Sequence, residues 1–213
     1  RRPPRSTLFP YPTLFRSKDG IFMCIHDGTI DRTTNGKGLV SDYTLAELKN
    51  FSAYYGREQF LDEKIPTLVE LAAILPENVA LELKLKTDRF LEEDICRQLI
   101  QILDDTGIRN RTFVISFSKE RVLTVHKLAK DIPAGLITMS GFSPDPDVQI
   151  IGPFFPLIFL NPFYISKIRK NKQIICPLDP TPDNRLWIYQ KMKVDAVLTD
   201  NPQTTCKKIK KYN

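Results

Sequence analysis

Residues 79–117 read VALELKLKTDRFLEEDICRQLIQILDDTGIRNRTFVISF. Residues 79–85 alternate side chains with the period of two that is typical of a strand. Residues 88–106 have the apolar spacing of an amphipathic helix, which is expected to end at Gly107. Residues 112–117 form a second apolar run. Because a long helix joins the two runs, we expect parallel strands connected by a right-handed crossover.

The same alternation of strand and helix continues on both sides of this unit. A short apolar run lies at Ile21–Ile25, and further strands are predicted at 133–139, 157–160, 173–178 and 194–199. Helices are predicted at 44–50, 67–75, 119–130, 162–170, 183–191 and 202–210, and the first two begin with the capping boxes Thr44/Glu47 and Thr67/Glu70. Six crossover strands, near residues 80, 113, 135, 158, 175 and 196, suit a doubly wound sheet or a barrel within one domain.

Composition indicates a globular protein rather than a disordered chain. The 213 residues are 42% hydrophobic and 26% charged. No apolar stretch approaches the ~18 residues of a membrane-spanning helix, so no transmembrane segment is expected. The apolar run at 150–159 is short and contains two prolines.

The net charge of +6 comes from the two ends of the chain. Residues 1–16 hold four Arg and residues 207–213 hold four Lys, with no acidic residue in either segment. Removing those eight from the 31 basic residues leaves 23 against 25 acidic residues. This distribution argues against a nucleic-acid partner, because a nucleic-acid-binding domain carries its basic residues across one face.

The four cysteines show no pattern of metal binding or disulfide bonding. Cys24, Cys96, Cys176 and Cys206 are too far apart in sequence for a Cys-x-x-Cys pair. The redox compartment, and with it a cytoplasmic or exported location, stays open. The oligomeric state also stays open.

The first 17 residues, RRPPRSTLFPYPTLFRS, have neither a helical nor a strand period and repeat Thr-Leu-Phe. They resemble translated sequencing adapter. We therefore expect residues 1–17 to be a non-native, disordered leader and residues 18–213 to form the domain.

Three side chains are candidates for chemistry. His26 ends an apolar run and precedes Asp27, so it could act as a general acid or base. Glu82 and Lys84 lie on one face of the strand at 79–85, opposite Leu81, Leu83 and Leu85. They could neutralise each other as a buried pair, or they could face the mouth of a barrel, where glutamate binds a cation and lysine a phosphate. Their place near the carboxyl end of the strand favours the mouth. His126 lies on a predicted helix and receives no role.

Residues 18–49, KDGIFMCIHDGTIDRTTNGKGLVSDYTLAELK, closely resemble the glycerophosphodiester phosphodiesterase family. The resemblance continues to about residue 202, through I-P-T-L (65–68), L-E-L-K (81–84), I-S-F (115–117) and V-D-A-V-L-T-D-N-P (194–202). It implies a TIM-type (β/α)8 barrel that hydrolyses glycerophosphodiesters to glycerol 3-phosphate and an alcohol with a divalent cation, Mg²⁺ or Ca²⁺. It also implies a catalytic role for His26, metal ligation by Glu82 and phosphate binding by Lys84.

The chain departs from the family's pattern before Lys18. The family's opening strand carries His-Arg-Gly with a first catalytic histidine, and its second strand carries Glu-x-Asp with two more metal ligands. Neither motif precedes Lys18. Near the seventh strand, Cys176-Pro-Leu-Asp-Pro-Thr181 stands where the family often has Trp-Thr-Val-Asn. We therefore expect an incomplete barrel that lacks its first two strands, and a chain that is impaired as an enzyme and poorly soluble.

Two alternatives from other classes of protein remain. A non-catalytic barrel homologue would bind phosphodiesters or a partner without turnover. A nucleic-acid or anionic-membrane binder would depend on the basic ends alone, and would lose its affinity when residues 1–16 and 207–213 are removed.

Overall fold

The computed structural model describes residues 12–141 and 143–212 of the chain. Its strands are β1 (Thr13–Arg16), β2 (Phe22–Cys24), β3 (Leu81–Leu85), β4 (Thr112–Ser116), β5 (Ala134–Thr138), β6 (Ile150–Pro153) and β7 (Ile174–Ile175). Its α-helices are α1 (Leu45–Leu48), α2 (Leu68–Ile74), α3 (Glu93–Asp105), α4 (Lys119–Leu128), α5 (Pro156–Leu160), α6 (Tyr164–Lys170), α7 (Leu186–Lys191) and α8 (Pro202–Tyr212). Short 3₁₀ turns lie at Val40–Asp42, Glu58–Phe60, Asp88–Leu91, Arg109–Arg111 and Pro182–Asn184.

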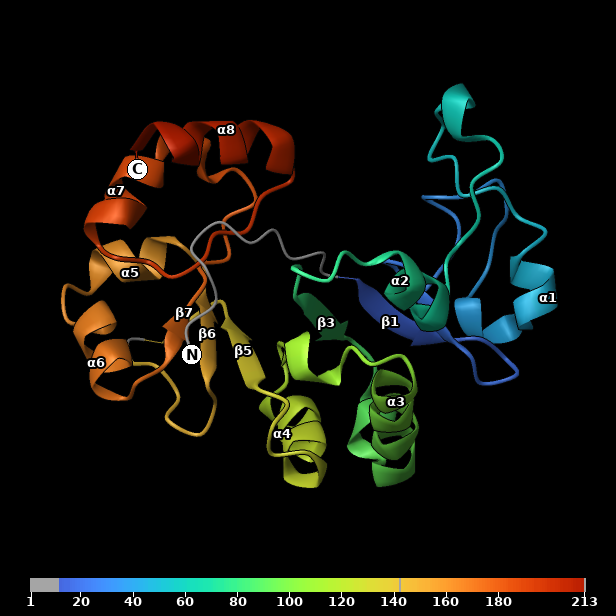
Figure 1. Cartoon of the computed structure of the whole chain (residues 1–213), viewed down its shortest axis with the longest axis horizontal. Helices are drawn as coiled ribbons and strands as arrows, with labels where there is room; N and C mark the ends of the chain where they lie inside the picture. The colour runs from blue at the N-terminus through green and yellow to red at the C-terminus, as the bar shows by residue number, and fades with distance from the viewer. Residues whose placement is uncertain (1–11, 142, 213) are drawn as a thin grey trace.

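The strands form one curved sheet in the order β2-β1-β3-β4-β5-β6-β7. Every neighbouring pair from β1–β3 onward is parallel, and only β1–β2 is antiparallel. Figure 1 shows α3 and α4 below the middle of the sheet, and α5 to α8 beside its β6–β7 end. This is the arrangement of an α/β barrel whose ring of strands is incomplete, because β2 and β7 end the sheet without pairing to each other.

The core divides into two clusters. The larger cluster packs the outer face of the sheet, including Leu83, Val114 and Ile151, against the helices. The smaller cluster, which contains Met23, Ile30, Val40, Leu48 and Ile65, supports residues 23–65. We call residues 26–65 the lobe. In Figure 1 the lobe projects upward on the right, across from α8.

Both predicted capping boxes are confirmed. The Thr44 side chain accepts from the Glu47 backbone N–H, and the Glu47 side chain accepts from the Thr44 backbone N–H. Thr67 and Glu70 make the same reciprocal pair at the start of α2. The helices therefore begin at residues that the sequence identifies, since each box satisfies backbone donors that the first turn leaves unpaired.

The expected disordered leader at residues 1–17 is wrong for residues 12–17. Thr13–Arg16 form β1, which pairs in parallel with β3 and antiparallel with β2. Thr13 and Leu14 are 2% and 0% exposed. The segment enters the sheet because its apolar residue Leu14 covers the same core as Leu85, its partner in register. Residues 1–11 lie outside the described residues.

Two predicted strands also differ. Residues 157–160 belong to helix α5, and the strand is Ile150–Pro153. The continuous apolar run from Ile150 fits a buried strand or a buried helix, and Pro156 at the start of α5 favours the helix. Residues 194–199 pair in no strand, although the backbone N–H groups of Asp195 and Ala196 donate to the Ile175 carbonyl.

Within residues 12–141 and 143–212, no helix has the length and apolarity needed to cross a membrane.

Candidate active site

Strand β3 divides its side chains between two environments. Leu81, Leu83 and Leu85 are fully buried in the larger core cluster. Glu82 and Lys84 point to the opposite face, where they line a cavity of about 40 Å³ inside the curve of the sheet. The other lining residues come from β4, β5 and β6 and from the chain after β7, namely Ile115, Gly135, Leu136, Ile137, Ile150, Gly152, Cys176, Pro177, Leu178 and Leu198.

Glu82 is a carboxylate in an apolar surrounding. It is 8% exposed, and burial raises the pKa of its carboxyl to about 7, an effect that the Lys84 charge opposes. Lys84 does not fold back onto Glu82, because its ammonium lies 4.8 Å from the centroid of the Phe117 ring. Burial is also the main cause that lowers the pKa of Lys84. The two residues therefore share one face of the strand without forming the closed ion pair considered from sequence.

His26 lies at the exit of β2 in a chain of polar contacts. Its Nδ1 is 2.6 Å from Asp27 Oδ1, and Arg32 Nε donates to Asp27 Oδ2 at 2.6 Å. The hydrogen bond from Arg32 is the largest cause that lowers the pKa of Asp27 to about 2. An ionised Asp27 favours the tautomer with the proton on Nδ1, so Nε2 is left as the atom available for proton transfer. The His26 side chain is 54% exposed, which leaves it open to a ligand.

Lys86 connects His26 to strand β3. Its Nζ donates to the His26 carbonyl at 2.8 Å and lies 3.4 Å from His26 Nε2. Sequence reasoning did not identify this lysine, although the alternation of Glu82 and Lys84 continues to position 86. The structure thus places His26 at the carboxyl end of β3. The residues that line the 40 Å³ cavity do not include His26, which reaches the strand through Lys86.

Thr13 is the other residue that sequence reasoning left out. It pairs in register with Lys84, so the two side chains share the inner face of the sheet. Its hydroxyl oxygen is buried and has no hydrogen-bond partner in the described part of the chain. A buried hydroxyl without a partner carries a desolvation cost, which marks this position as poorly matched to its neighbours.

A second polar cluster follows β7. Asp179 is 1% exposed and accepts from Arg185 through both carboxylate oxygens, at 2.7 and 2.6 Å. The Tyr189 hydroxyl donates to the same carboxylate at 2.6 Å. Because its charge is balanced by Arg185, Asp179 serves as an anchor for α7 rather than as a free acid.

Parallel strands wrapped by helices, with polar side chains at their carboxyl ends, define a barrel of the TIM type with its site at the mouth. A family model described as the glycerophosphoryl diester phosphodiesterase family matches residues 15–148. The chain belongs to this family of phosphoric diester hydrolases, as its motifs predict.

Relatives and solved structures agree with this assignment. The chain is 30% identical over 212 residues to a glycerophosphodiester phosphodiesterase of Caldanaerobacter subterraneus, covering 92% of this chain and 83% of that protein. It is 28% identical to one from Bacillus altitudinis, covering 90% and 82%. The fold matches an Agrobacterium tumefaciens glycerophosphodiester phosphodiesterase with a TM-score of 0.79 and 22% identity, covering 92% and 85%. It also matches an Oleispira antarctica phosphodiesterase, solved with the product sn-glycerol-3-phosphate, with a TM-score of 0.81 and 22% identity, covering 97% and 86%. The predicted barrel class is confirmed.

The residues present do not fit the divalent cation on which this family generally depends. In the described ranges, no group of three or more His, Cys, Asp or Glu side chains could hold a metal ion. Glu82 offers one carboxylate, and the other residues that line its cavity are apolar except for Lys84 and Cys176. Hard cations require several oxygen ligands, and an adjacent ammonium repels them.

Proposed function

We propose that the site at the mouth binds glycerophosphodiesters, with His26 as its proton-transfer group and Lys84 as a contact for the phosphate. The observation that carries this proposal is the position of His26, backed by Asp27, at the end of the strand that bears Lys84. Hydrolysis of a phosphodiester releases an alkoxide, which needs a proton as the P–O bond breaks. Nδ1 of His26 is held by Asp27, so Nε2 delivers that proton when the ring carries a proton on both nitrogens, and the ring is left with its proton on Nδ1.

We further propose that this chain is impaired in hydrolysis. The family resemblance assigns Glu82 to a metal-ligand position, but no group of three or more His, Cys, Asp or Glu side chains in the described part of the chain could hold a metal ion. General acid–base catalysis by one positioned group contributes about 10²–10⁴-fold, so a site with His26 and without a bound cation should retain only weak activity.

The test is a hydrolysis assay of the full chain on glycerophosphocholine with Mg²⁺ or Ca²⁺, following glycerol 3-phosphate release by ³¹P NMR. The Caldanaerobacter relative serves as the positive control under the same conditions. We expect turnover at least about 100-fold below that control, and a further loss in His26→Asn. Turnover equal to the control would contradict the impairment, and an unchanged His26→Asn rate would contradict the role of His26.

The alternative reading as a non-catalytic homologue is favoured by the same lack of clustered carboxylates. It predicts saturable binding of glycerophosphocholine with no product and no effect of His26→Asn on the background rate.

The adapter origin of residues 1–17 stays a prediction, which the genomic DNA upstream of the Lys18 codon would test.

A further inference from the structure

Lys86 is a cation that the family resemblance does not assign to any role, yet it makes the contacts that hold His26 in place. Its ammonium contacts the histidine twice, at the backbone carbonyl (2.8 Å) and near ring atom Nε2 (3.4 Å). The two residues are 60 positions apart in sequence, so this contact ties the lobe to the end of β3. The third proton of the ammonium remains available for another acceptor.

The mouth carries two ammonium groups, Lys84 and Lys86, on which the nearest carboxylates, Glu82 and Asp27, act from beyond ion-pair distance. One carboxylate oxygen of Asp27 contacts His26, and the other accepts a hydrogen bond from Arg32. Lys84 lies over the Phe117 ring, and Lys86 faces His26, so neither ammonium forms an ion pair with a carboxylate among residues 12–141 and 143–212. Burial is the largest cause that lowers the pKa of both lysines. Partly desolvated cations without a carboxylate partner favour an anion between them.

We propose that Lys86 is a positioning residue for His26, and that its ammonium also contacts the phosphoryl oxygens of a phosphoester bound at the mouth. This inference rests on the proposed function, because it concerns the same site. Lys86 keeps the His26 ring beside β3 and places a donor next to Nε2. A phosphate oxygen that accepts from Lys86 is thereby brought to the nitrogen that exchanges a proton.

Inorganic phosphate is the probe, because it carries the charge of the reacting group without requiring turnover. Phosphate is titrated at pH 8 into the full chain while the imidazole signals are followed by NMR. The chain has only two histidines, and His126 provides an internal reference. It lies on helix α4, away from the mouth, and its Nδ1 is 2.8 Å from the Ile132 carbonyl oxygen. We expect phosphate to shift the His26 signals and to leave those of His126 in place.

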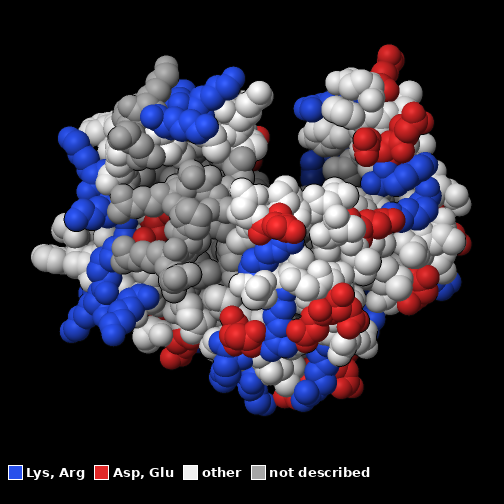
Figure 2. Space-filling model, viewed as in Figure 1, with Lys and Arg blue, Asp and Glu red and all other residues white. Residues whose placement is uncertain are grey.

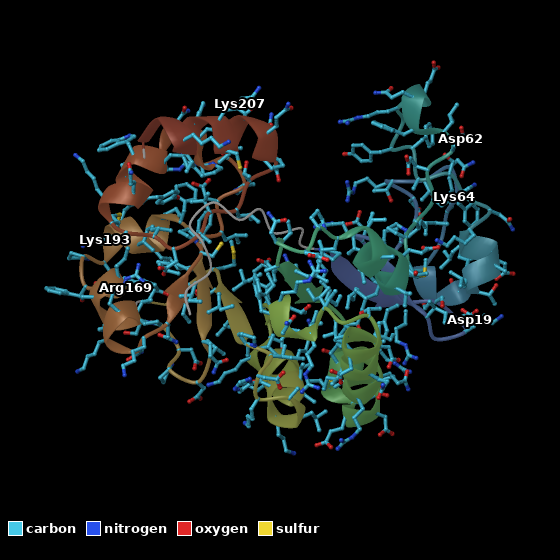
Figure 3. All side chains as sticks on the ribbon, in the orientation of Figure 1. Asp19, Asp62, Lys64, Arg169, Lys193 and Lys207 are labelled. Carbon is cyan, nitrogen blue, oxygen red and sulfur yellow. The ribbon has the colours of Figure 1, made fainter. Side chains whose placement is uncertain are left out.

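The variants are Lys86→Met, Lys86→Arg and the matched control Lys64→Met. Lys64 lies in the lobe, apart from the sheet in Figure 3. We expect Lys86→Met to weaken phosphate binding about tenfold and to change the ¹⁵N shifts of the free His26 ring. Lys86→Arg should stay within about twofold of the parent, since it keeps the charge and the donors. Lys64→Met should match the parent.

Three results would overturn the inference: no phosphate-dependent shift of His26 in the parent chain, equal affinity in Lys86→Met, or an affinity for Lys86→Arg as weak as for Lys86→Met. The hydrolysis assay is separate from this experiment. A chain that binds phosphate through Lys86 but does not hydrolyse the diester refutes the proposed activity alone. Hydrolysis that proceeds while Lys86→Met binds phosphate normally refutes this inference alone.

Discussion

Glu82 shows how one residue couples the site to the stability of the fold. Burial raises the pKa of its carboxyl from 4.5 to about 7 in the folded chain. Between those values the folded state binds a proton more tightly than the unfolded state does. The free energy of unfolding should therefore fall as the pH rises from about 4.5 to about 7, and level off above that, by about 3 kcal/mol in total.

The variant Glu82→Gln isolates this effect, because it keeps the shape of the side chain and does not ionise. Urea denaturation of both proteins at about pH 5 and about pH 8 gives four free energies of unfolding. The parent should lose free energy of unfolding between the two pH values, whereas Glu82→Gln should not lose this contribution, so Glu82→Gln gains stability relative to the parent at the higher pH. Parallel pH dependences would show that Glu82 is not desolvated as the structure places it.

Asp179 is a second buried carboxylate, but here the charge is paired. Arg185→Met removes the two hydrogen bonds that the guanidinium donates to Asp179 and leaves a carboxylate that is 1% exposed. We expect a loss of about 3–5 kcal/mol in the free energy of unfolding, measured by chemical denaturation. The double variant Asp179→Asn/Arg185→Met should recover part of the loss. If the double variant were as unstable as Arg185→Met, the cost would come from packing instead of the charge.

At the scale of elements, β1 is the unexpected part of the sheet. Leu14 is fully buried and lies opposite Leu85 in the parallel pair with β3. Leu14→Ala should therefore lower the free energy of unfolding by about 2–5 kcal/mol in a denaturation experiment. Leu160→Ala is the matched control, because Leu160 is 68% exposed and should cost less than about 0.5 kcal/mol. Equal and small effects of both variants would mean that residues 13–16 are not part of the folded sheet.

At the scale of the whole molecule, the site lies between two differently built sides. Figure 2 shows the surface hollowed between the lobe and the α8 side, with Lys and Arg gathered over α8. Helix α8 is fastened to the body, since Thr205 donates to Asp183 at 2.6 Å and Lys208 pairs with Asp183 at 3.0 Å. Part of the basic C-terminal segment is thus built into the fold, as part of the helix that the sequence predicts at 202–210.

Some backbone hydrogen-bonding groups at the two edge strands of the sheet, β2 and β7, are paired with neighbouring segments. The Cys24 backbone N–H at the β2 end donates to the Pro66 carbonyl, and the 195–196 backbone donates to Ile175 at the β7 end. Both end strands are short, at three and two residues. Short and partly covered edges reduce the risk of edge-to-edge association. The predicted poor solubility stays a prediction.

The sequence by itself determined the class of fold, the family and the inward face of β3. These follow from local rules, because a strand alternates its side chains with a period of two and a capping box marks the start of a helix. Only the tertiary structure decided that Thr13 lies beside Lys84 and that Lys86 contacts His26. Both contacts join residues about 60 to 70 positions apart, and no local periodicity encodes such a pairing. The tertiary structure also decided where the apolar run at 150–160 changes from strand to helix. A short apolar run is compatible with a buried strand and with a buried helix, so its composition does not distinguish the two.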